Sequence, residues 1–202
     1  MKKVLLTLFL ITTTAIAFAQ TVTFGIKGGI NMATQTFINQ GTSYPNQYKS
    51  GFQLGGIADF TFKNFAIQPG IFFITKGKKE TNLVTTFSST LNYIEVPVNL
   101  LYKLHAAPDL VVYFGGGPFL GYGLGGTQTD GQEKTKITFD DDHFNVLYKN
   151  PDYGLNFIAG AEFGKHILLD AGYSLGLANI AYDSSVMEKN RVITVGVGYM
   201  FR

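Results

Sequence analysis

The segment Arg191-Val-Ile-Thr-Val-Gly-Val-Gly-Tyr-Met-Phe-Arg202 has two unlike faces. The odd-numbered positions from Ile193 to Phe201 are all apolar, whereas Thr194, Gly196 and Gly198 stand between them. Such strict alternation predicts a β-strand with one apolar face. The predicted strand, 191–201, matches the roughly 9–11 residues that a tilted strand needs to cross a bilayer.

The same alternation recurs towards the N-terminus, and no segment from Thr21 onward keeps a helical period. These segments run for roughly 11 to 15 residues, whereas strands of soluble proteins cluster near 5–6 residues. This length favours strands that span a membrane. We therefore expect eight strands, at residues 22–34, 51–62, 65–76, 91–104, 110–124, 153–163, 167–179 and 191–201.

Connections of two sizes separate these segments. Short ones fall at 63–64, 105–109 and 164–166, and long ones at 35–50, 77–90, 125–152 and 180–190. Long loops at one rim and short turns at the other are typical of outer-membrane barrels, whose long loops face outward from the cell. The sequence thus predicts an all-β fold, an eight-stranded antiparallel up-and-down transmembrane β-barrel in the outer membrane. Both termini would lie in the periplasm.

The polar face of the strands decides which side meets lipid, because a soluble barrel would bury its apolar face instead. Charges are too few on this face for a solvated surface, and eight strands enclose a lumen that side chains fill. We therefore expect the apolar face to meet lipid, with Tyr93 and Phe119 among the side chains that fill the lumen. Seven charged residues fall inside the strands, all on the polar face: Lys27, Asp59, Lys76, Glu95, Lys103, Glu162 and Asp170.

Aromatic residues mark the predicted strand ends. Rings at the two rims of a membrane barrel form girdles at the interfaces between hydrocarbon and water. The candidates here flank the short turns or end the chain, and they are Phe62, Phe65, Tyr102, Tyr199 and Phe201.

The N-terminus carries the pattern of an export signal. Lys2-Lys3 precedes an apolar run, and Ala17-Phe18-Ala19 fits a signal-peptidase site. An uncleaved anchor is the alternative, but threonines dilute the run below the roughly 20 apolar residues of a spanning helix. We expect residues 1–19 to be a cleaved signal peptide and 20–202 to be the barrel domain.

Charge and cysteine content exclude several classes of function. The 16 basic residues include Lys2 and Lys3, so loss of the leader leaves 14 basic and 14 acidic side chains. A neutral chain is not expected to bind nucleic acid, which needs clustered Lys and Arg. The absence of Cys excludes disulfide bonds and Cys-ligated zinc sites.

The order of short motifs resembles the PorT-like family of small outer-membrane barrels from Bacteroidetes-type bacteria. The motifs span the mature chain, and they are Phe24-Gly-Ile-Lys-Gly-Gly-Ile-Asn31, Gln68-Pro69, Asn92-Tyr-Ile-Glu-Val-Pro97, Gly117-Pro-Phe-Leu-Gly121, Asp170-Ala-Gly-Tyr-Ser-Leu-Gly-Leu177 and Gly198-Tyr-Met-Phe201. The resemblance implies an outer-membrane barrel and transfers no catalytic residue. Gly70 and Gly172 stand where the family often has an acid and an arginine, so an ion pair between these positions is missing.

Three groups of residues deserve a test as reactive sites. Asp140-Asp141-Asp142-His143 could hold a hard cation, but it lacks the Gly and Glu of a calcium loop. Ser184 or Ser185 with Asp183 and His143 would supply the residue types of a hydrolase, although their spacing does not support one. Glu95 and Asp170 could form a carboxylate pair, yet we expect Lys27, Lys103 or water to satisfy them. We therefore predict no catalytic, cofactor-binding or metal-binding residue, and no enzyme.

Two further motifs have structural or surface roles. The basic run Lys76-Gly77-Lys78-Lys79-Glu80 lies near the predicted outer rim, where it could meet the phosphates of lipopolysaccharide, but we expect it to be a solvated loop base. Gly115-Gly116-Gly117 lacks the Lys-Ser/Thr pair of a phosphate loop, so we expect it to allow strand curvature or make room for neighbours.

The function that best fits these features is a structural or interaction barrel that acts through loops 35–50, 125–152 and 180–190. A narrow channel or a barrel for a small ligand or lipid is the alternative, and an outer-membrane hydrolase is less favoured. The expected partners are outer-membrane lipid, lipopolysaccharide and a protein of the periplasm or outer membrane.

Overall fold

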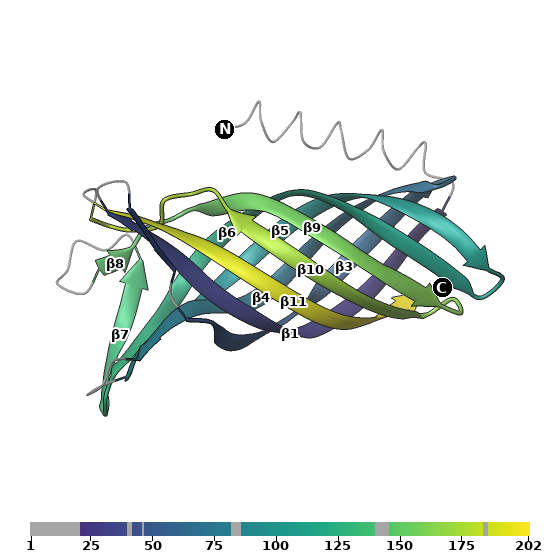
Figure 1. The fold of residues 1–202 in the computed structure, drawn as a ribbon. Helices are drawn as coiled ribbons and strands as arrows, with labels where there is room; N and C mark the ends of the chain where they lie inside the picture. Colours follow the sequence, from purple (N-terminus) through teal and green to yellow (C-terminus); the bar gives the residue numbers. More distant parts are fainter. Residues whose placement is uncertain (1–20, 40–41, 46, 82–85, 140–145, 184–185) are drawn as a thin grey trace, which may run out of the picture.

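Eight long antiparallel strands form a closed ring in the computed structural model (Figure 1). The structure describes residues 21–39, 42–45, 47–81, 86–139, 146–183 and 186–202, so the predicted signal peptide lies outside it. Among the described residues, no helix is long and apolar enough to cross a membrane. The ring strands are β1 (Thr21–Asn39), β3 (Lys49–Phe62), β4 (Phe65–Thr81), β5 (Thr86–Ala107), β6 (Leu110–Asp130), β9 (Asp152–Phe163), β10 (Ile167–Gly176) and β11 (Met187–Phe201).

The first and last strands close the ring. β1 pairs with β11 over a long register that runs from Phe24↔Phe201 to Ile38↔Met187. Each ring strand therefore has a partner on both sides, which is the condition for placing strands in hydrocarbon. The predicted eight-stranded antiparallel barrel is confirmed.

The two faces of the strands are separated as the alternation predicts. On β11 the side chain of Val197 is 54% exposed on the outer wall, whereas Gly196 and Gly198 are buried towards the lumen. All seven charged residues that were assigned to the polar face are buried, with exposed fractions between 1% and 7%. The outer wall is consequently apolar and the lumen is polar.

Several strands extend beyond their predicted ends. β4 and β5 stay paired as far as Thr81↔Thr86, so the prediction of a long loop at 77–90 was wrong. Apolar alternation stops where a strand leaves the apolar layer, whereas backbone pairing continues past that point. Three unpredicted short strands also lie in the expected loops 35–50 and 125–152, namely β2 (Thr42–Pro45), β7 (Glu133–Phe139) and β8 (Val146–Tyr148).

One strand is shorter than predicted, because a side chain organises the connection that follows it. β10 ends at Gly176 instead of residue 179. The Asn179 Oδ1 accepts hydrogen bonds from the backbone N–H groups of Ala181 and Glu188, and its Nδ2 donates to the Val186 carbonyl. Asn commonly replaces ladder hydrogen bonds with such local ones.

The connections define two rims. The short-turn rim carries the turns between β3 and β4, β5 and β6, and β9 and β10, together with the C-terminus (Figure 1). Neighbouring rings lie on its outer wall, with Phe65 and Tyr102 centroids 5.1 Å apart and Tyr102 and Phe114 centroids 5.8 Å apart. Tyr199 and Phe201 add another pair at 5.7 Å. The opposite, long-loop rim carries β2, β7 and β8.

Candidate functional site

The lumen near the short-turn rim is occupied by an ion-pair cluster. Lys103 Nζ lies 3.0 Å from Asp59 Oδ2 and 2.6 Å from Glu162 Oε1. Arg202 supplies the second cation, with its Nη2 2.6 Å from Glu162 Oε2. The buried Lys103 and the more exposed Arg202 therefore balance two buried acids, which offsets the desolvation of the carboxylates.

A second ion pair crosses the middle of the lumen. Lys27 Nζ lies 2.7 Å from Asp170 Oδ2, and the Tyr113 hydroxyl donates to the same oxygen over 2.9 Å. An apolar layer of buried residues also packs inside the ring. It consists of the buried residues Ile57, Ala66, Phe72, Leu101, Tyr113, Leu168 and Met200.

The third group is centred on Lys76, whose ammonium contacts two carboxylates. It pairs with Glu95 and, at 3.0 Å, with Asp152, and it lies 4.7 Å from the ring centroid of Phe119. The Asn190 Nδ2 donates to Asp152 over 2.9 Å. Such a cation held against two acids and a ring is a packed structural centre.

These contacts decide the question of a carboxylate pair. Asp170 is held by Lys27 as expected, but Glu95 is held by Lys76, so the expected partner for Glu95 was wrong. The two carboxylates are neutralised by different lysines, and each acts as a strut of the lumen wall. Asp152, which completes the Lys76 centre, was missed because the sequence places it at the boundary of a loop.

A small polar cavity of about 50 Å³ remains in the lumen. It is lined by Gly70 and Gly172, the two positions at which the PorT-like pattern often has an acid and an arginine. Asn99 and Asn156 also line it, and their side-chain oxygens have no hydrogen-bond partner among the described residues. Small size and unsatisfied acceptors fit a cavity that holds a few water molecules.

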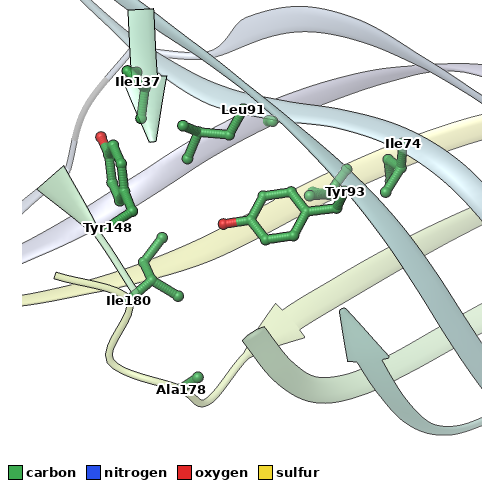
Figure 2. Packing of buried hydrophobic residues seen from close by; sticks show 9 residues of the cluster. Ile74, Leu91, Tyr93, Ile137, Tyr148, Ala178 and Ile180 are labelled. Atoms are coloured by element: carbon green, nitrogen blue, oxygen red, sulfur yellow. The ribbon is translucent and has the colours of Figure 1, made fainter. Parts of the chain in front are cut away.

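The lumen is covered at the long-loop rim by a hydrophobic cluster, which we call the rim cluster. Figure 2 shows Tyr93 beside side chains from β5, β7, β8 and the β10–β11 connection. Burial raises the pKa of the Tyr148 phenol, and Glu188 raises it further, so this hydroxyl stays protonated and donates to Gln35. The rim cluster comprises Ala33, Ile74, Leu91, Tyr93, Ile137, Tyr148, Ala178, Ile180 and Val192.

A hairpin of β6 and β7 reaches beyond the ring at this rim (Figure 1). Residues 130–136 are exposed, whereas Ile137 is buried in the rim cluster and anchors the hairpin at its base. The hairpin tip thus presents backbone and polar side chains, including Lys134 and Lys136, away from the lumen.

The candidate reactive residues are not brought together in the described part of the chain. Residues 140–143 and the serines at 184 and 185 lie outside it, and Asp183 is exposed. No group of three or more His, Cys, Asp or Glu that could hold a metal occurs among the residues described. The cation and hydrolase hypotheses therefore gain no support from the described geometry.

The basic run and the glycine run take different positions. Lys76 and Lys78 are buried, and Lys78 pairs with Glu188 at 2.6 Å, so only Lys79 is exposed. The expectation that this run is a solvated loop base was wrong, because it belongs to β4 and strand alternation turns two of its three lysines inward. Gly115 and Gly117 allow close packing of β6 on β5, since a Cβ at either position would overlap a β5 carbonyl oxygen.

A model of the outer membrane protein beta-barrel domain matches residues 18–182. The chain belongs to this family. Membership and the closed ring make it an integral outer-membrane β-barrel protein. No match appears among the curated proteins.

Solved structures of other outer-membrane proteins are similar to this chain. OprG from Pseudomonas aeruginosa is 14% identical with a TM-score of 0.51, covering 93% of this chain and 99% of its own. Neisserial surface protein A is 13% identical with a TM-score of 0.48, covering 90% of this chain and 100% of its own. At such identities the similarity to OprG supports the barrel fold alone.

Proposed function

We propose that this outer-membrane barrel is a structural or interaction protein that acts through the segments at its long-loop rim, and that it is not an enzyme. The observation that supports this proposal most is the filled lumen. Three ion-paired groups and an apolar layer occupy it, and the rim cluster covers it. Among the described residues, the projecting hairpin of β6 and β7 then offers an accessible surface for a partner.

A narrow channel or a barrel for a small ligand is the second candidate, and the polar cavity of about 50 Å³ is the observation in its favour. Conduction requires a continuous path of water, whereas the cavity lies among ion-paired side chains. A hydrolase has less support, because the spacing of its candidate residues in the sequence does not favour one, and His143, Ser184 and Ser185 lie outside the described residues. We also propose that the protein is a PorT-like barrel, and the order of its short motifs supports this assignment.

The proposed orientation places the long-loop rim outside the cell and both termini in the periplasm, as expected for a barrel with long loops at one rim. Outer-membrane lipid and lipopolysaccharide would surround the outer wall. A protein of the outer membrane or periplasm would be the specific partner, and nucleic acid would not bind.

The orientation of the barrel can be tested with single cysteine variants, because the chain has no cysteine of its own that would react. A single cysteine replaces Thr135 at the hairpin or Lys165 in the short turn between β9 and β10, and intact cells receive a membrane-impermeant maleimide. The proposal expects labelling of Thr135→Cys alone, with Lys165→Cys labelled only after lysis. The reverse pattern would overturn the orientation.

Interaction through the hairpin can be tested by photo-cross-linking in the native membrane. A photoreactive amino acid replaces Thr135 on the hairpin, or Val197 on the lipid-facing wall as the control. The proposal expects discrete protein adducts at position 135 and none at position 197. Adducts at neither position, or equal adducts at both, would contradict a specific role for the hairpin.

A further inference from the structure

The outward face of β11 carries two cations near the long-loop rim, between the exposed Met187 at the start of the strand and the apolar residues from Ile193 onward. Lys189 and Arg191 continue the alternating face that carries Ile193, Val195 and Val197, while Glu188, Asn190 and Val192 turn inward. The lipid-facing column of β11 therefore changes from aliphatic to basic within two residues. Basic side chains at such a boundary are placed to meet phosphate head groups.

Arg191 is held in a fixed position on the outer wall. Its Nε donates to Thr36 Oγ1 over 2.9 Å, and its Nη1 donates to the Tyr173 hydroxyl over 3.2 Å. Thr36 belongs to β1 and Tyr173 to β10, so the guanidinium lies across three adjacent strands. A guanidinium has five N–H donors, and the two interactions leave the others available.

Neither cation is neutralised within the described part of the protein. The ion pairs found there involve Lys27, Lys76, Lys78, Lys103 and Arg202. The residues paired with Lys189 and Arg191 on β1 are Thr36 and Thr34, and Leu175 pairs with Arg191 on β10. This part of the outer wall carries two positive charges beside uncharged neighbours.

A shallow apolar hollow lies directly below Tyr173 on the same wall. Its floor has small residues at Gly116, Ala159 and Ala171, and the rings of Phe114 and Phe157 flank it. Tyr173 both lines the hollow and binds Arg191, so the basic and apolar features form one continuous surface. A phosphate above and a hydrocarbon chain below match its chemistry.

We propose that Lys189, Arg191 and the hollow below Tyr173 form a binding site for a phosphorylated acyl glycolipid of the lipid A type. The phosphate accepts hydrogen bonds from Arg191 and is neutralised by Lys189, and one acyl chain lies over Gly116, Ala159 and Ala171. Arg pairs with phosphate through directed, charge-assisted hydrogen bonds. The choice of an outer-leaflet lipid rests on the proposed orientation of the long-loop rim.

The test measures binding of bis-phosphorylated hexa-acyl lipid A to the mature full-length protein in detergent micelles, using native mass spectrometry. Variants are Arg191→Gln, Lys189→Gln, and the control Lys79→Gln, which removes an exposed lysine from β4. We expect Arg191→Gln to weaken binding about tenfold or more and Lys189→Gln several-fold. Lys79→Gln should change it less than about twofold.

Two further measurements test the phosphate-binding and acyl-chain-binding parts of the site separately. Dephosphorylated lipid A should bind the wild type at least about tenfold more weakly and should not respond to Arg191→Gln. Ala171→Phe should fill the hollow and weaken binding with both cations intact. Equal binding of both lipids, or wild-type binding by Arg191→Gln, would overturn the proposal.

Folding and orientation are controlled separately. Heat-modifiable gel mobility identifies folded protein, and if Arg191→Gln does not fold, Arg191→Lys and Lys189→Gln carry the test. Binding of lipid A measured in detergent micelles does not depend on which rim faces outward in the cell. A protein that binds lipid A in micelles but labels at Lys165→Cys on intact cells would therefore refute the proposed orientation and leave the site intact.

Discussion

Lys27 on β1 and Asp170 on β10 form their 2.7 Å ion pair across the intervening strand β11, above Gly196. A Cβ at Gly196 would lie 3.1 Å from Asp170 Oδ1 and 3.3 Å from Lys27 Cε. The glycine therefore leaves the space that the ion pair occupies. This pair joins the two strands on either side of β11, the strand that closes the barrel.

We expect Gly196→Ala to destabilise the barrel by about 1 kcal/mol, because its Cβ crowds the ion pair and a backbone carbonyl. Gly121→Ala is the matched control, since its Cβ would make ordinary contacts of 3.5–3.6 Å in the lumen. Urea unfolding in micelles measures both variants. Equal stability of the two variants would show that Gly196 does not make room for the pair.

Removing the cation of the Lys76 centre should be more damaging. Lys76→Met leaves the buried carboxylates of Glu95 and Asp152 without their shared cation, which costs about 3–5 kcal/mol. Adding Glu95→Gln removes one of these charges and should restore part of the loss. Unfolding midpoints of the single and double variants measure this coupling, and a double variant less stable than the single one would contradict it.

The assignment of the lipid-facing and lumen-facing sides of β11 can be tested at two adjacent residues. Val197→Arg places a charge in hydrocarbon, where it costs about 2–4 kcal/mol near the midplane. Gly198→Ser meets the lumen, where a Cβ lies 3.0 Å from the Ile26 carbonyl oxygen, and should be milder. The folded, heat-modifiable fraction in membranes distinguishes the variants. Tolerance of Val197→Arg together with loss of Gly198→Ser protein would reverse the assignment.

Packing of Ile137 in the rim cluster should protect the hairpin from protease, and its loss should leave the barrel folded. Ile137→Ala leaves a cavity at the base of the hairpin, and such substitutions cost about 2–5 kcal/mol. We expect faster trypsin cleavage at Lys134 and Lys136 while heat-modifiable mobility is kept. Leu169→Ala, on the lipid-facing wall, should leave the cleavage rate unchanged. Identical cleavage rates for Ile137→Ala and wild type would show that packing of Ile137 in the rim cluster does not hold the hairpin in place.

The barrel was predictable because the membrane imposes a simple pattern. Lipid requires an apolar side chain at every second residue, so alternation from Ile193 to Phe201 identifies strand, face and span together. Beyond the bilayer this requirement ends, and the pairing of Lys78 with Ser89 leaves no apolar signal. For that reason, the sequence does not locate the strand ends at the long-loop rim, or the strands β7 and β8.

The lumen contacts were predictable in kind but not in detail. Alternation places Glu95 and Lys76 on the inner face, yet strand register and tilt decide which groups meet across a ring. Glu95 therefore finds Lys76 on the neighbouring strand β4, and Asp152 joins them from β9. The same alternation placed Lys76 on the inner face, and continuing it by two residues would have placed Lys78 there as well.

Planar-bilayer recording of the purified full-length protein tests the filled lumen most directly. The ion pairs of Lys27, Lys76 and Lys103, together with the rim cluster, lead us to expect no steady conductance from folded monomer. Insertion is confirmed in the same preparation by heat-modifiable mobility. A stable, reproducible single-channel current from the wild-type barrel would contradict the account and favour the channel.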